Sequence, residues 1–451
     1  MTRLTEGLGA FVAGLTYEGI PAQALPVIHT GFTDCVGVML AGRNQAAVHL
    51  LQQALAPGSG PSTLLFGSAT AAPPEAAFIN GTAAHALDFD DVGLRGHPST
   101  VLVPAILAEA QALGSSGKDM MTAYAAGYEV WADLAQRDPD HHHTKGWHPT
   151  GIFGAIGAAA ACASLNKLDA EQSAVAISLG ASQSSGIMAN FGTMTKPFHA
   201  GRAASSGVLA ARLARAGFTA SLDALEHAQG FLQAVSPAGR VNVSGEVSAG
   251  EPWKLPTTKL SVKKYPLCFC THRALDGMLD LIAEMPIEAE EIEGITVSTS
   301  LRNATMLRNS QPQTGLEAKF SMQFAMASAV IAKAAGLSEL TDTFVQRPDV
   351  QALIKKAKVT VDPRDHPALP GYAPYDLVTI QLKDGRTIKS REVVEVRGGP
   401  EQPLSHEALW TKFQDCAQAG GFQESAKAIF DAFMSLETVE RVNSIPGLGG
   451  R

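Results

Sequence analysis

The stretch Asn80-Gly-Thr-Ala-Ala-His85-Ala-Leu-Asp88-Phe-Asp90-Asp91-Val-Gly-Leu-Arg95-Gly-His97-Pro-Ser-Thr100 decides how this chain folds and where its chemistry lies. The apolar residues before it and the Ala/Leu run inside it predict a buried helix that ends in Asp-Phe-Asp-Asp. Carboxylates in an apolar setting are costly unless they are paired, bound to an ion or protonated. The alternative is an ordinary helix end that runs into a solvated loop.

Three further polar stretches favour a functional site over that alternative. They are Lys145-Gly-Trp-His148-Pro-Thr150-Gly, Thr193-Met-Thr-Lys196-Pro-Phe-His199-Ala-Gly-Arg202 and Lys263-Lys264-Tyr-Pro-Leu-Cys268-Phe-Cys270-Thr-His272-Arg273. Together with His-Ala-Leu-Asp-Phe-Asp-Asp and His-Pro-Ser in the opening stretch, they resemble the MmgE/PrpD family. The matching pieces follow the family's order, and the resemblance spans nearly the whole chain. The family includes 2-methylcitrate dehydratases, cis-aconitate decarboxylases and iminodisuccinate epimerases.

The fold class that we expect is mainly α, with a large all-α helical domain and a smaller inserted α+β domain. Residues up to about 255 are rich in Ala and Gly and have helical periodicity, whereas strand-like alternation begins after Pro252. The domain boundaries that we predict are 1–257 for the first part of the helical domain, 258–399 for the α+β domain, and 400–451 for the return to the helical domain. The family resemblance implies the same division, with the smaller domain covering the site.

Local patterns also predict the elements of the α+β domain. Helices are expected at 271–285, 318–335 and 350–356, and strands at 258–261, 293–300, 358–362, 377–383 and 387–396. Asp384-Gly385 is a hairpin turn signal between the last two strands. Helical segments at 405–418 and 424–436 complete the chain.

Composition excludes several classes of function. The chain has 451 residues and a formal net charge of −8, with no Lys/Arg-rich block, which argues against nucleic acid as a partner. No signal peptide and no membrane-spanning segment are expected, so we predict a cytoplasmic protein that does not bind membranes. An odd, scattered set of five cysteines suits a reducing compartment.

Three motifs that resemble cofactor or metal sites are interpreted otherwise. Residues 151–157 are glycine-rich, but no strand precedes them, as a nucleotide-binding loop requires. The pair Cys268 and Cys270 lacks a second cysteine pair for zinc. The tract at 141–143 is three histidines in a charged loop, which we expect to be solvated. We therefore predict an enzyme with no cofactor and no metal.

The polar stretches suit a substrate that carries several carboxylates. Removal of a proton next to a carboxylate needs a base, together with cations or hydrogen-bond donors for the developing charge. The family resemblance implies that the catalytic residues are Asp88, His97, His148, Lys196 and His272. From their charge or hydroxyl group we expect the substrate-binding residues to be Arg95, Thr150, Arg202, Lys264 and Arg273. His199 is interpreted as a buried, hydrogen-bonded histidine that serves packing.

Two positions depart from the pattern of the decarboxylases in the family. A Thr that follows the Asp-Asp pair is Val92 here, and a Tyr in a later helix is Phe324. Because two hydroxyl donors are lost, we predict an isomerase that epimerises iminodisuccinate or a similar polycarboxylic acid. Dehydration of a 2-methylcitrate-like acid is the alternative, followed by cis-aconitate-type decarboxylation. A non-catalytic member that only binds a polycarboxylate is the rival from another class.

Two expectations concern assembly. The catalytic residues span both domains, so the pocket is predicted at the domain interface. The helical domain has more apolar surface than a small inserted domain can cover, and the family resemblance implies dimers. We therefore expect a homodimer built through the helical domain.

Overall fold

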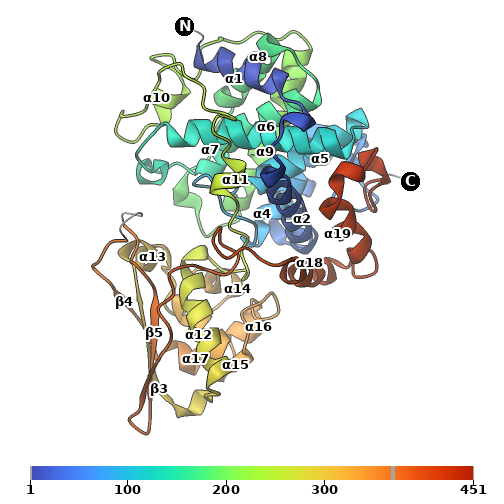
Figure 1. Ribbon diagram of the computed structural model, residues 1–451. Coiled ribbons are helices and arrows are strands. Elements are labelled where there is room, and N and C mark those ends of the chain that lie inside the picture. Colours follow the sequence, from blue (N-terminus) through green and yellow to red (C-terminus); the bar gives the residue numbers. More distant parts are fainter. Residues whose placement is uncertain (1–2, 367–370, 450–451) are drawn as a thin grey trace. The chain divides into compact units, whose positions relative to one another are not determined.

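A computed structural model of the chain describes residues 3–366 and 371–449 (Figure 1). The chain divides into two compact units. The first unit comprises Met1–Ser261 and His406–Arg451, and the second comprises Val262–Ser405. The predicted boundaries at 258 and 399 fall close to these divisions. The mainly α fold class with a smaller α+β part is confirmed, and the predicted homodimer stays a prediction.

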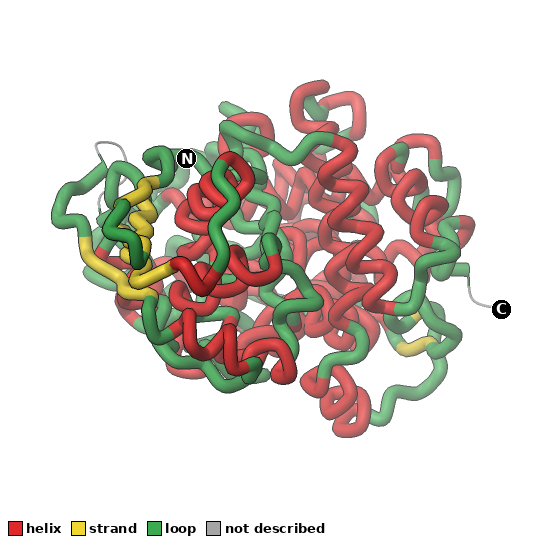
Figure 2. The backbone as a smooth tube through the Cα atoms, turned by 90° about the horizontal axis from the view of Figure 1, so that it is seen from below, coloured by secondary structure: helices red, strands yellow, loops and turns green. Residues whose placement is uncertain are grey.

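The first unit consists mostly of α-helices, drawn in red in Figure 2. Its α-helices are α1 (Leu4–Gly14), α2 (Leu25–Gly42), α3 (Ala46–Leu55), α4 (Pro73–Ala86), α5 (Ser99–Leu113), α6 (Gly117–Gln136), α7 (Pro149–Leu165), α8 (Ala170–Ser182), α9 (Thr195–Arg215), α10 (Phe231–Val235), α11 (Leu255–Thr258), α18 (His406–Gly420) and α19 (Ala426–Met434). Short 3-10 turns are η1 (Tyr17–Gly19), η2 (Ala22–Ala24), η3 (His142–Lys145), η4 (Met188–Asn190), η7 (Leu436–Thr438) and η8 (Val442–Ser444). A small antiparallel pair, β1 (Ser62–Thr63) with β2 (Thr70–Ala71), is the exception to the predicted all-α character.

Helices α4 and α9 pack backbone to backbone, and this packing brings two predicted catalytic residues together. A Cβ atom on Gly81 would lie 2.8 Å from the Cα atom of Gly201, and one on Gly201 would lie 2.2 Å from the Phe78 carbonyl oxygen. Only glycine permits this approach. The carboxyl end of α4 leads to Asp88, and the amino end of α9 carries Lys196, so the crossing places both at one end of the helix pair.

The apolar character of α7 is explained by complete burial. All residues from Pro149 to Leu165 are buried. Helix α7 packs against α6, α8 and α9, and a Cβ atom on Gly207 of α9 would lie 2.3 Å from the Cβ of Ala158. The helix therefore forms the centre of the first unit, and its amino end carries His148.

One helical segment, Ala22–Gly42, is long and apolar enough by composition to cross a membrane. Its most apolar 18-residue window is 72% buried inside the structure. Such burial is typical of a core helix, because the apolar side chains already contact protein. The predictions of a cytoplasmic location and of no membrane partner stay predictions.

The second unit is an α+β unit built on a four-stranded sheet. The strands are β3 (Ile292–Thr299), β4 (Ala357–Val361), β5 (Leu377–Leu382) and β6 (Thr387–Lys389), in the order β4-β3-β5-β6. Strand β4 is parallel to β3, and the other two pairings are antiparallel. The helices are α12 (His272–Glu284), α13 (Leu301–Met306), α14 (Gly315–Ala318), α15 (Met322–Ala332), α16 (Asp342–Val345) and α17 (Pro348–Ile354), with 3-10 turns η5 (Phe269–Thr271) and η6 (Ala289–Glu291). Helices α12 and α15 pack on one face of the sheet (Figure 1).

Three predicted elements of this region differ from the structure. The predicted strand at 258–261 is wrong, because Leu255–Thr258 is helical and only Ser261 forms an isolated bridge, with Val92. The predicted helix at 318–335 is shorter, Met322–Ala332, since the Ser321 hydroxyl accepts a hydrogen bond from the Phe324 N–H and so begins the helix there. The predicted strand at 387–396 ends at Lys389.

Candidate active site

The site begins where α4 ends. The backbone turns after Leu87, and Asp88 adopts a φ of 51°, a left-handed conformation that aspartate tolerates better than most residues. This turn directs the Asp88 carboxylate to the amino end of α9, where its Oδ1 lies 2.6 Å from the Lys196 Nζ. Both side chains are about nine-tenths buried, so each charge compensates the other. Asp88 is thus the partner of a buried ammonium group, and its catalytic role stays a prediction.

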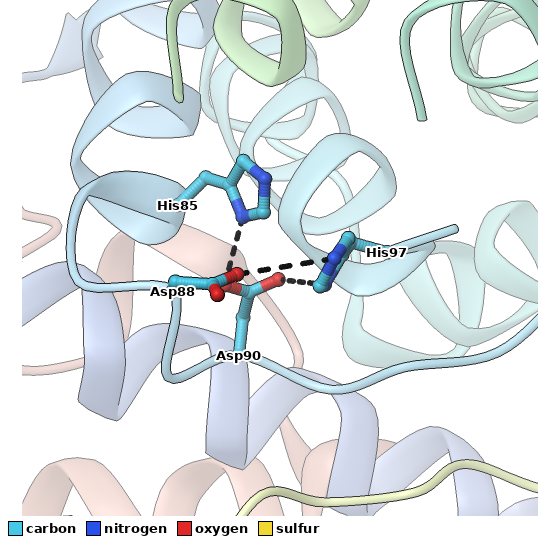
Figure 3. A group of neighbouring side chains, drawn as sticks. All are labelled: His85, Asp88, Asp90 and His97. Carbon is cyan, nitrogen blue, oxygen red and sulfur yellow. Dashed lines mark hydrogen bonds and ion pairs between the residues drawn. The ribbon is translucent and has the colours of Figure 1, made fainter. Parts of the chain in front are cut away.

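A second carboxylate, Asp90, lies between two imidazoles (Figure 3). His85, in the last turn of α4, places its Nδ1 2.8 Å from Asp90 Oδ1, and His97 places its Nδ1 2.8 Å from Oδ2. The Asp90 and His85 side chains are fully buried. Burial alone would raise the pKa of Asp90, but the two imidazoles outweigh it and hold that pKa well below its usual range. Burial lowers the pKa of His85 to about 3, so His85 is a neutral donor to an ionised carboxylate.

The orientation of His97 is fixed by three contacts. Its backbone N–H donates to the Thr150 hydroxyl at 3.2 Å, and its Nδ1 donates to the Asp91 carbonyl oxygen at 2.8 Å. The Asp90 oxygen lies beside that N–H bond rather than in line with it, so the Asp90 contact is mainly electrostatic. Because a carbonyl oxygen can only accept, Nδ1 carries the hydrogen. The His97 Nε2 then faces the Asp88 Oδ1, 3.9 Å away.

A second pair of imidazoles joins the amino ends of α7 and α9. The Nδ1 atoms of His148 and His199 lie 3.1 Å apart, so one donates and the other accepts. Burial lowers the pKa of both, and the neighbouring Lys196 ammonium lowers them further. The interpretation of His199 as a buried, hydrogen-bonded histidine is confirmed. Its partner, however, is a predicted catalytic residue. Phe191 packs edge-on against His148, with ring centroids 4.7 Å apart.

A network of buried polar side chains anchors the loop that carries Asp88 and Asp90. The Asp91 carboxyl contacts the Ser99 hydroxyl, which lies 2.7 Å from the Tyr124 hydroxyl. Burial raises the pKa of Asp91 well above its usual range, and nearby carboxylates add to this, so Asp91 keeps its proton. Lys412 of α18 donates to the Phe89 carbonyl oxygen at 2.8 Å and forms an ion pair with Asp34. Lys412 is buried and was not singled out from the sequence.

Four donor groups of the types that bind transition metals lie together in the described part of the chain. Ligand atoms of His85, Asp88, Asp90 and His97 lie within 4.8 Å of one another. Hydrogen bonds and ion pairs already engage them. The Lys196 ammonium holds Asp88, while the Nδ1 atoms of the two imidazoles hold Asp90. A metal would have to displace these contacts, and the absence of a metal remains our prediction.

Three predicted site residues belong to the second unit. His272 begins α12 and is fully buried there, with its Nε2 3.2 Å from the Leu267 carbonyl oxygen. Arg273 donates to the Ala373 carbonyl oxygen at 3.0 Å. Burial lowers the pKa of Lys264, whose Nζ lies 5.7 Å from the centroid of the Tyr265 ring. Their roles in catalysis and binding stay predictions, as does a pocket between the domains.

The remaining predicted binding residues have partners inside the first unit. Arg95 donates to the carbonyl oxygens of Asp138 and Asp140 at 3.0 and 2.8 Å, so it ties two loops together. The guanidinium carbon of Arg202 lies 6.0 Å from the centroid of the Phe78 ring. Thr150 is fully buried and accepts the His97 N–H. Binding of substrate by these three residues is untested and stays a prediction.

Sequence reasoning missed some contributors and misjudged one region. His85 and Asp90 stand in the quoted motif, but nothing in the sequence showed that Asp90 would lie between two imidazoles. The prediction that the 141–143 tract is solvated is wrong for His142, which is buried against Phe153 with ring centroids 4.8 Å apart. Burial lowers the pKa of His142 to about 4.

Comparison with known proteins places the chain in a family. Residues 6–244 match the model of the MmgE/PrpD N-terminal domain, and residues 265–437 match the MmgE/PrpD C-terminal domain. The chain is 26% identical to cis-aconitate decarboxylase of Homo sapiens, over 97% of this chain and 92% of the relative. It is 26% identical to cis-aconitate decarboxylase of Mus musculus over 97% and 91%, and 24% identical to that of Aspergillus terreus over 83% and 80%. With both family domains matched in order, the chain belongs to the MmgE/PrpD family.

Proposed function

We propose that this protein is a lyase that transfers a proton next to a carboxylate of a small polycarboxylic acid, with decarboxylation of a cis-aconitate-like acid as the favoured outcome. The observation that carries the proposal is the chain of contacts from His97 Nε2 to Asp88 to the Lys196 ammonium. Relatives named cis-aconitate decarboxylase, which align over most of their length, support this outcome over epimerisation.

His97, Lys196 and His148 have different roles, which follow from the charge that each side chain carries. Because His97 Nδ1–H is held by the Asp91 carbonyl, its Nε2 is the nitrogen that exchanges a proton with substrate. Lys196 supplies a buried positive charge that a substrate carboxylate can share with Asp88. His148 is neutral and offers a hydrogen bond without adding charge. The site can therefore bind an anion and move one proton.

These groups can carry out the decarboxylation of an unsaturated tricarboxylic acid with every bond, electron pair and proton accounted for. The bond from a CH2 carbon to one carboxylate breaks, and CO2 leaves without its bonding electrons. That electron pair moves into a new double bond, and the former double bond shifts its electrons to the distal carbon. The distal carbon then takes a proton from His97 or Lys196, and solvent restores the proton. Charge that develops along the way is stabilised by the ammonium group.

Epimerisation is the second candidate, because one feature of the chain favours it. Val92 and Phe324 are apolar at two positions where hydroxyl groups are expected for a decarboxylase, and Phe324 is fully buried in α15. Epimerisation requires removal and return of one α-proton and no leaving group, so it depends less on such donors. Dehydration of a hydroxy acid starts with the same proton removal.

One experiment separates these outcomes. The purified protein is incubated in D2O with cis-aconitate, iminodisuccinate or 2-methylcitrate, and products are followed by NMR together with released CO2. We expect CO2 release and one carbon-bound deuterium per product molecule from cis-aconitate. Deuterium exchange without loss of CO2 or water would identify an epimerase, and loss of water a dehydratase. If none of these acids reacts or exchanges, the enzymatic proposal is overturned in favour of a binding protein.

A further inference from the structure

We propose that Asp90 is the positioning carboxylate of the site: together with the Asp91 carbonyl oxygen it holds the His97 imidazole in its working orientation, and it stabilises the positive charge that this ring gains when it takes up a proton. His85 completes this arrangement by occupying the other Asp90 oxygen. The inference rests on the proposed function in one respect, namely that His97 transfers the proton.

Asp90 contacts one imidazole at each of its two oxygens. Its two oxygens each lie 2.8 Å from an imidazole Nδ1, and the three side chains come from the end of α4, the turn after it and the loop before α5. The rings of His85 and His97 lie with their centroids 4.5 Å apart. The carboxylate is therefore held at both ends, and it cannot rotate without breaking one of the two contacts.

The negative charge of Asp90 is compensated by the two imidazoles beside it. A fully buried carboxylate needs compensation, and the hydrogens on the two Nδ1 atoms provide it. An ionised Asp90 beside the His97 Nδ1–H favours the protonated form of that ring, since opposite charges attract strongly in a buried setting. The carboxylate thus stabilises the charge that forms when a proton is added at Nε2, the nitrogen that faces Asp88.

His85 and His97 differ in their exposure to solvent, which makes His85 the structural partner of Asp90 and His97 the ring that reacts. The His85 side chain is fully buried, and its Nε2 has no hydrogen-bond partner among residues 3–366 and 371–449. A proton added there would place a charge in an apolar setting, so His85 stays neutral. His97 is 13% exposed at its side chain, which leaves its ring accessible to a reacting molecule. His85 therefore holds Asp90, and Asp90 holds His97.

The neighbouring Asp91 offers a matched comparison for the test. Both carboxyl groups are fully buried on consecutive residues, but Asp90 is ionised and Asp91 is protonated. An amide replaces a protonated carboxyl with little change, because it accepts through oxygen and donates through nitrogen. It cannot supply the negative charge that Asp90 places between the two imidazoles. Asp90→Asn should therefore disturb the site far more than Asp91→Asn.

The experiment combines pH–rate profiles with NMR titration of the imidazoles in 15N-histidine-labelled protein, where the His97 signals are assigned with His97→Gln. For Asp90→Asn we expect kcat to fall by about 10²- to 10⁴-fold with KM within about threefold, the usual signature of a lost orienting carboxylate. The limb of the profile that His97 controls should move to lower pH, whether the ring acts as acid or base. Asp91→Asn should keep the wild-type limb and the wild-type His97 titration.

The result that overturns the inference is a folded Asp90→Asn protein with the kcat and the His97 titration of the wild type. That outcome would leave the proposed function intact. If the wild type turns over no acid, the proposed function fails, whereas the NMR titration still tests the Asp90–His97 contact. Should Asp90→Asn not fold, His85→Phe and His85→Asn replace it. Asn keeps a donor near the Nδ1 position, so the His97 titration should shift with Phe and stay with Asn, and equal titrations would overturn the inference.

Discussion

The helical unit contains two pairs of imidazoles, His85 with His97 and His148 with His199, and the two pairs differ in their surroundings. His85 and His97 share a carboxylate, and they lie at the end of α4 and in the loop that follows it. His148 and His199 share one hydrogen bond with each other, and they lie at the amino ends of two buried helices.

The difference teaches what sets the proton affinity of a buried histidine. Burial lowers the pKa of His148 and of His199, and the adjacent Lys196 adds to that effect. In the first pair, burial lowers the pKa of His85 to about 3 despite the Asp90 carboxylate, whereas the His97 side chain is 13% exposed and lies beside both Asp90 and Asp88, so His97 is the member suited to proton transfer. A neutral pair with no carboxylate between its rings is suited instead to hydrogen bonding.

The largest effect on stability should come from removing Lys412, which anchors the loop of the His85–His97 pair. Lys412→Met removes the ammonium that holds the Phe89 carbonyl and leaves the buried Asp34 without its ion-pair partner. We expect a loss of about 3–5 kcal/mol in the free energy of unfolding, measured by urea denaturation. The Asp34→Asn/Lys412→Met double variant should recover part of that loss. Additive losses in the double variant would show that the ion pair does not anchor the loop.

Removing Lys196 should affect both pairs at once. In Lys196→Ala, kcat should fall by roughly 10²-fold or more if the ammonium transfers a proton as well as binding substrate. NMR titration should also show a higher pKa for His199, because the ammonium that lowers it is gone. A raised KM with unchanged kcat would assign Lys196 to binding alone.

The members of the second pair should differ from each other. His148→Ala should lower kcat by roughly 10²-fold, whereas His199→Ala should mainly lower the free energy of unfolding, by about 1–3 kcal/mol, since it leaves a buried polar group without its partner. Steady-state kinetics and urea unfolding on both variants check this. If His199→Ala abolishes turnover in a folded protein while His148→Ala stays active, the catalytic groups are assigned wrongly.

Acid should destabilise the protein through the second pair. The folded-state pKa values of His148 and His199 lie below the ordinary value of about 6.5, so the unfolded chain binds more protons as pH falls through that value. Their contribution is complete well above pH 6.5 and declines as the pH falls below that value. Urea unfolding should show a smaller decline for His148→Gln/His199→Gln. If the free energy of unfolding declines equally in the variant and the wild type, groups other than these two histidines cause the acid sensitivity.

The smallest effect should come from chelation. Hydrogen bonds and the Lys196 ion pair engage His85, Asp88, Asp90 and His97, so activity after EDTA treatment and dialysis should equal that before it. Turnover of cis-aconitate before and after dialysis provides the measurement. Activity that disappears with EDTA and returns with a divalent ion would make the four residues a metal centre.

The sequence by itself determined the architecture and most of the participants. Helical periodicity, strand alternation and turn residues predicted two units, because these signals depend on neighbours along the chain. Its four polar stretches identified Asp88 and Lys196, which form the central ion pair.

Only the tertiary structure decided which group pairs with which. Asp88, Asp90 and Asp91 are three similar carboxyl groups in one short motif, yet one binds an ammonium, one lies between imidazoles and one keeps its proton. The left-handed turn at Asp88 and the crossing of α4 and α9 separate them. Lys412 approaches from more than 300 positions away in sequence. Protonation depends on burial and on contacts a few ångströms long, and these exist only after distant segments have packed.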